Sequence, residues 1–134
     1  MVYPLQGVSS PGVIFLPFLF YPNGTSVSAL VVAPAFASTS TSNAFIASVI
    51  RTSTAGQFTI TLRDSYVQYL GGNAQIHLNT PATDLKCIFD LVDVVTNKTV
   101  RLNILAVATP TDITGNANSY IAVQLYLGNS AINF

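Results

Sequence analysis

The sequence predicts an all-β fold, a β-sandwich of the jelly-roll-like or Greek-key kind. Apolar and polar residues alternate with a period of two along several short runs, as expected for strands with one buried face. Turn-forming residues separate these runs, and about seven or eight short strands with frequent turns favour a sandwich. The 134 residues are one domain's worth of chain and suffice for a hydrophobic core.

The front of the chain has an unusual composition, because the first charged residue is Arg51. We expect residues 1–43 to form an apolar, uncharged N-terminal segment, an arm or hairpin that packs on the sheet or on partners. Residues 44–134 would form the sandwich body, and the two parts together a single domain. Pro22-Asn23-Gly24 is typical of a hairpin turn between two apolar runs.

The two front runs are apolar on both faces. Val13–Phe20 has no polar side, and in Ser26–Ala33 the side chains of Leu30 and Val32 oppose a second apolar row. Strands that are apolar on both faces must be covered on both faces, whereas a small sandwich has only one interior. The surplus faces therefore predict packing against other subunits.

The rest of the chain alternates more regularly. The predicted strands are Gln57–Arg63, Asn73–Asn79, Leu85–Leu91, Thr99–Val107 and Ser119–Leu127. One short helix is expected near residues 64–71. Asp64 or Ser65 would cap it, Tyr66 and Leu70 lie four residues apart, and Gly71-Gly72 would end it.

Charge and hydropathy exclude several classes of partner. Only 7% of the residues are charged and the net charge is zero, whereas an average soluble domain carries about 25%. Such a chain lacks the basic surface that holds nucleic acid or an anionic membrane. The longest apolar stretch, Gly12–Tyr21, is half of the roughly 20 residues that a spanning helix needs. We expect neither a nucleic-acid nor a membrane partner.

No catalytic pattern is apparent in the sequence. His77 is the single imidazole, it lies on the polar phase of its strand, and no Gly-x-Ser-x-Gly motif occurs. Cys87 falls on an apolar phase beside Phe89, where a thiol behaves as a small core residue. The five aspartates have no calcium-loop spacing. We expect no enzyme activity, no catalytic residues, no cofactor and no metal.

Tyr120 and Tyr126 lie on the polar phase of the last strand. Their face could pack on a neighbouring subunit, be covered by the same chain, or stack against sugars. Together with the apolar front they complete the set of expected partner contacts. These are Val13, Phe15, Phe18, Phe20, Leu30, Val32, Tyr120 and Tyr126.

Two stretches resemble a known family. Arg51-Thr-Ser-Thr-Ala-Gly-Gln-Phe-Thr-Ile-Thr-Leu-Arg-Asp-Ser-Tyr66 and the late Val123-Gln-Leu-Tyr-Leu-Gly-Asn-Ser130 are similar to the head decoration (cement) proteins of tailed bacteriophages. The similarity covers roughly residues 50–130 and carries over no catalytic residue.

The resemblance implies a β-sandwich that sits on the outer capsid surface of the virion as an oligomer. From it we expect a structural virion protein, made in the host cytoplasm, whose partners are the major capsid protein and itself, with a homotrimer favoured. The alternative is a carbohydrate- or receptor-binding module of a phage tail or fibre. Glycan binding by the tyrosine-bearing face would distinguish this alternative.

Overall fold

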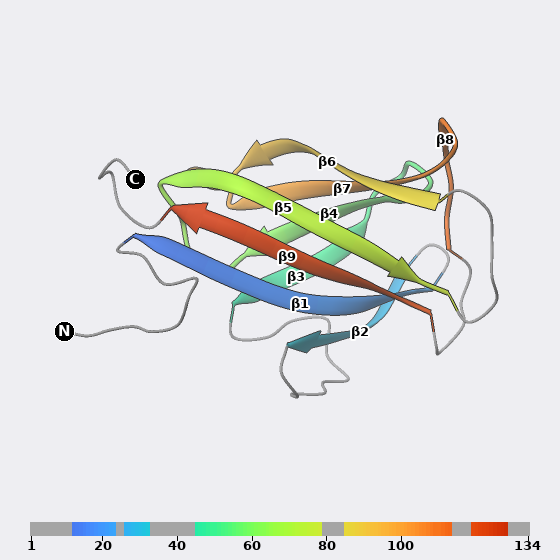
Figure 1. The fold of residues 1–134 in the computed structure, drawn as a ribbon, viewed down its shortest axis with the longest axis horizontal. Helices are drawn as coiled ribbons and strands as arrows, with labels where there is room; N and C mark the ends of the chain where they lie inside the picture. Colours follow the sequence, from blue (N-terminus) through green and yellow to red (C-terminus); the bar gives the residue numbers. More distant parts are fainter. Residues whose placement is uncertain (1–11, 24–25, 33–44, 79–84, 114–118, 129–134) are drawn as a thin grey trace.

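The computed structural model describes residues 12–23, 26–32, 45–78, 85–113 and 119–128. Two antiparallel sheets pack against each other as a β-sandwich (Figure 1), as the sequence predicts. The strands are β1 Val13–Asn23, β2 Ser26–Val32, β3 Ile46–Arg51, β4 Gln57–Leu62, β5 Gln68–His77, β6 Leu85–Asp93, β7 Thr99–Ala106, β8 Thr109–Pro110 and β9 Tyr120–Gly128.

The strands divide into a four-stranded and a five-stranded layer. Sheet A has the order β2-β1-β9-β5, and sheet B has the order β3-β4-β7-β6, with β8 paired to β7. In Figure 1 the long strands β1, β9 and β5 cross in front of β3, β4 and β7. The open edges of the sandwich are therefore β2 and β5 in sheet A, and β3 and β6 in sheet B.

The core lies between the two sheets. Every second residue of β1, β4, β7 and β9 is buried, which is the period that the sequence predicts for one-sided strands. Phe20 of sheet A and Phe58 of sheet B meet across this layer, with ring centroids 5.2 Å apart. Both rings are fully buried, so the two sheets are joined by a close-packed aromatic contact.

The apolar front of the chain is built into the sandwich. β1 and β2 form the expected hairpin, and β1 also pairs with β9 from Val13 opposite Gly128 to Phe20 opposite Ile121. β1 is thus an interior strand of sheet A, and the residues before and after position 43 share one core. The expected arm is a hairpin of the sheet itself, while residues 1–11 and 33–43 lie outside the described residues.

The prediction of a short helix near residues 64–71 is wrong. The described residues contain no helix, and β5 begins at Gln68. Main-chain bonds to distant strands hold this segment extended: the amide of Tyr66 donates to the carbonyl of Val94 (2.9 Å), and the amide of Val67 donates to Gly128 (2.8 Å). Tertiary hydrogen bonds here override the local capping pattern, because an extended segment satisfies its amides against β6 and β9.

Candidate functional site: the uncharged outer face of sheet A

Charge is segregated between the two sheets. None of the four strands of sheet A contains Lys, Arg, Asp or Glu. The strands of sheet B contain five such residues, namely Arg51, Lys86, Asp90, Asp93 and Arg101. The charge-free strands therefore form one sheet, sheet A. Strands from the front of the chain, β1 and β2, and a strand from its end, β9, both contribute to it.

Cross-strand pairing arranges the outer face of sheet A in four rows over β1, β9 and β5. The rows are Phe15, Tyr126 and Gly71; Pro17, Gln124 and Asn73; Leu19, Ala122 and Gln75; Tyr21, Tyr120 and His77. The two outer rows are aromatic, and the two inner rows consist of amides and small or aliphatic side chains. We call this set of residues the uncharged face.

The aromatic rows are packed within themselves. At one end the rings of Phe15 and Tyr126 stack with centroids 5.1 Å apart. At the other end His77 stacks on Tyr120 at 4.5 Å, with 11° between the ring planes, and Tyr120 meets Tyr21 at 5.7 Å. Such cross-strand contacts hold the rings of this face in a fixed arrangement.

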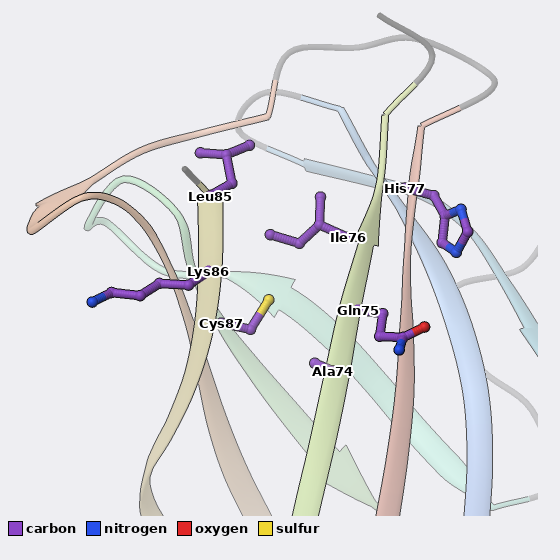
Figure 2. A pocket seen from close by; sticks show the side chains of 7 residues that line it. All are labelled: Ala74, Gln75, Ile76, His77, Leu85, Lys86 and Cys87. Atoms are coloured by element: carbon purple, nitrogen blue, oxygen red, sulfur yellow. The ribbon is translucent and has the colours of Figure 1, made fainter. Parts of the chain in front are cut away.

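The uncharged face is open to solvent in the isolated chain. The four aromatic residues of β1 and β9 in these rows are partly exposed, and Asn73, Gln75, Gln124 and His77 are exposed. The side chains of Gln75 and His77 point to this side of β5, away from the space between β5 and β6 (Figure 2). The face thus presents aromatic rings and amides, with hydrogen-bonding groups but no Lys, Arg, Asp or Glu.

The structure separates the expected partner contacts into three groups. Phe15, Tyr120 and Tyr126 belong to the uncharged face, and Val13 is partly exposed at its end. Phe18 and Phe20 are not available to a partner in this fold, because their exposed fractions are 3% and 0%. Both residues lie on the side of β1 that faces the core, where every second residue is buried. Because the run is apolar on both sides, its sequence alone does not show which side is buried.

The two remaining expected contacts lie in the edge strand β2. Leu30 is paired with Phe20, and Val32 is paired with Phe18; their side chains are outside the described set. Sequence reasoning did not assign Asn73, Gln75 or Gln124 to a site. Their strand phase was readable, but their adjacency to β1 depends on β9 lying between β1 and β5.

The outer face of sheet B has the opposite character. The guanidinium of Arg101 donates to both carboxylate oxygens of Asp90 at 2.8 and 2.7 Å, and the amide of Asn103 donates to the same carboxylate at 2.7 Å. Gln57 donates in turn to Asn103 at 3.0 Å. The Arg101 hydrogen bond is the main cause that lowers the pKa of Asp90. This network crosses three strands and suits a face in contact with water.

A second ion pair ties the β3–β4 turn to the segment after β8. Arg51 donates through Nε and Nη2 to Asp112 at 3.1 and 2.5 Å. Asp112 also accepts the amide of Gly56 at 2.7 Å. The Arg51 hydrogen bond, and then the Gly56 hydrogen bond, lower the pKa of the Asp112 carboxyl despite partial burial. These hydrogen bonds hold the turn after β3 against the segment that follows β8.

The side chains of Cys87 and His77, the nucleophile and base candidates, point in different directions (Figure 2). Cys87 lies beside an open cavity of about 560 Å³ between β5 and β6, which is lined by Ala74, Gln75, Ile76, His77, Leu85, Lys86 and Cys87. Burial raises the pKa of its thiol to about 11, so the thiol stays protonated at neutral pH. Lys86 and His77 point away from this cavity (Figure 2).

Among the described residues, no group of three or more His, Cys, Asp or Glu side chains is placed to hold a metal ion. Over the same residues there is no helix with the length and hydropathy required to cross a membrane.

Comparison with known proteins gives no assignment. No family model, curated protein or solved structure matches this chain.

Proposed function

We propose that this chain is a structural virion protein that works by associating with other protein subunits, and that it decorates the outer surface of a bacteriophage head after synthesis in the host cytoplasm. One observation carries the proposal: the fold collects an aromatic, charge-free surface on one sheet and places the ionic network on the other. The phage context comes from the sequence resemblance alone. The proposal includes no catalytic role, cofactor or metal.

The physical argument concerns desolvation. Burying a charged side chain at an interface costs several kcal/mol unless it finds a partner, and the uncharged face has no such charge to bury. Buried apolar area contributes about 25 cal/mol per Å² before the costs of association. A modest contact in each copy is repeated over a shell, so the sum reinforces the joints between coat subunits.

The opposite face suits exposure to water. Arg101, Asp90 and Asn103 already satisfy one another, so a partner that covered them would remove them from water without supplying a missing hydrogen bond. The same sheet also exposes the apolar side chains of Ile50 and Ile88. A decoration protein needs this two-sidedness, with one face for contacts and one for solvent.

A second candidate function is glycan binding by a module of a phage tail or fibre. The observation that favours it is the combination of the Tyr126 and Tyr120 rings with the exposed amides of Gln124 and Asn73 on one surface. Aromatic rings stack on sugar rings, and amides supply donors and acceptors to hydroxyl groups. Binding on a glycan array, lost in Tyr126→Ala, would support this candidate.

Immunogold electron microscopy tests the two proposals against each other. Antibodies against the purified chain are applied to phage particles grown in the host from which the sequence comes. Gold on the heads is the expected result, and gold confined to tails or fibres favours the glycan-binding module. Particles that carry no label would refute a virion role, provided that the same antibodies label the purified chain on the grid.

A further inference from the structure

The uncharged face is large enough for a stable protein contact. β1, β9 and β5 have 11, 9 and 10 residues. With strands about 4.8 Å apart and about 3.3 Å per residue, these three strands and the seven-residue β2 beside them cover roughly 600 Å² in projection. Side-chain relief increases the accessible area, and a standard interface buries about 800 Å² per partner.

The same face satisfies the electrostatic condition for packing against its own copy. In a two-fold contact the same surface of both subunits comes together. A surface with a net charge therefore repels its own copy. Sheet A has no Lys, Arg, Asp or Glu in any strand. The outer face of sheet B carries fixed ions, among them Arg101 and Asp90, which would have to be desolvated in such a contact.

The two outer rows of the uncharged face match each other. Both contain aromatic rings, Phe15 and Tyr126 in one row and Tyr21, Tyr120 and His77 in the other. A two-fold axis in the plane of the contact therefore brings an aromatic row against an aromatic row, whether the axis runs parallel or perpendicular to the strands. The amides of Asn73, Gln75 and Gln124 lie between these rows, and each amide both donates and accepts hydrogen bonds.

We infer that the outer face of sheet A is covered by the same face of a second copy of this chain, related by a two-fold axis. This inference rests on the proposed role in association and names the partner at that surface. It also replaces the homotrimer expected from the resemblance with a face-to-face dimer, in which the ionic faces of sheet B point outward on both sides.

Nearly isosteric charge insertion tests the inference. Gln124→Glu and Asn73→Asp each add a negative charge to an exposed inner-row position with almost no change in volume. The control Thr61→Glu adds the same charge to the outer side of β4 in sheet B. Light scattering after size exclusion gives the mass, and analytical ultracentrifugation gives the dissociation constant.

The wild-type chain should have twice its monomer mass of 14.2 kDa. Gln124→Glu and Asn73→Asp should each raise the dissociation constant at least about 100-fold, because two unpaired carboxylates become buried in every dimer. Thr61→Glu should change it less than about 3-fold. Circular dichroism of the dissociated variants should still give the spectrum of a folded β-protein.

Three results would overturn the inference: a wild-type monomer, a wild-type trimer, or a dimer that survives both insertions on the uncharged face. Failure of the proposed function is distinguishable from these. A dimer with the expected variant behaviour, found together with particles that carry no gold label, would keep the two-fold contact and remove the virion role.

Discussion

Gly56 occupies a position where a single methyl group should destabilise the whole sandwich. Its φ is +67°, in the left-handed region that glycine tolerates best. A β-carbon there would lie 2.7 Å from the carbonyl oxygen of Ile104, 2.9 Å from the amide of Thr111, and closer still to the carbonyl oxygen of Thr111. These are main-chain atoms, and the Thr111 amide is itself bonded to the Ile104 carbonyl, so they cannot move aside cheaply.

The expected cost of Gly56→Ala is the sum of three effects. The left-handed conformation costs an alanine about 1–2 kcal/mol. Relief of the clash costs about 1–3 kcal/mol. Displacement weakens the hydrogen bonds of Gly56 to Asp112 and Ile104, at about 1 kcal/mol or more. The total is about 3–6 kcal/mol, a large share of the roughly 5–15 kcal/mol that stabilises a typical domain.

Urea denaturation at neutral pH and fixed protein concentration measures this cost. Gly71→Ala is the matched control, because Gly71 also has a positive φ of 146° but no atom within 4 Å of the added carbon. We expect Gly71→Ala to lose about 1–3 kcal/mol, from backbone strain alone. The reasoning is refuted if the two variants lose the same stability, since the close approach at Gly56 would then contribute nothing.

Three further predictions follow from burial and charge. Phe20→Ala should lower the free energy of unfolding by about 3–5 kcal/mol and Phe15→Ala by much less, because only Phe20 is fully buried; equal losses would contradict this assignment. The pKa of Asp112 is lowered in the folded state, so the unfolded state binds more protons in acid. The free energy of unfolding should therefore fall as the pH drops below about 4–5. Arg51→Met should flatten this pH dependence, and an unchanged slope in urea titrations would argue against the ion pair. Burial raises the pKa of Cys87 from 9.0 to about 11, which lowers the fraction of reactive thiolate about 100-fold. The thiol should therefore react with Ellman's reagent about 100-fold more slowly in the folded protein than in urea. Comparable rates would show that the thiol is not shielded.

The sequence predicted the strands but not which of them are neighbours. The phase of β4, β7 and β9 could be read directly, because each presents one apolar side to the core. The segment around Tyr66 was misread as a helix, because local capping signals were visible and the hydrogen bonds to Val94 and Gly128 were not. Long-range pairing of this kind leaves no mark on local periodicity.

The candidate site was predictable in part. Tyr120 and Tyr126 were assigned to a face outside the core from their phase alone, and the structure places both on the uncharged face. Phe18 and Phe20 were assigned to a partner because β1 is apolar on both sides, although one side is the core. A strand that is apolar on both sides is expected to be covered on both sides. Which of the two sides faces the protein's own core becomes clear only from the fold.

The central position of β9 has a consequence for biosynthesis. Phe20 pairs with Ile121, about 100 residues later in the chain, so sheet A cannot close until the last strand has left the ribosome. Until then one edge of the hydrophobic β1–β2 hairpin lacks its neighbouring strand, and exposed edges of this kind favour aggregation. Sheet A should therefore be completed late and slowly, and expression in the cold or with chaperones should raise the soluble yield.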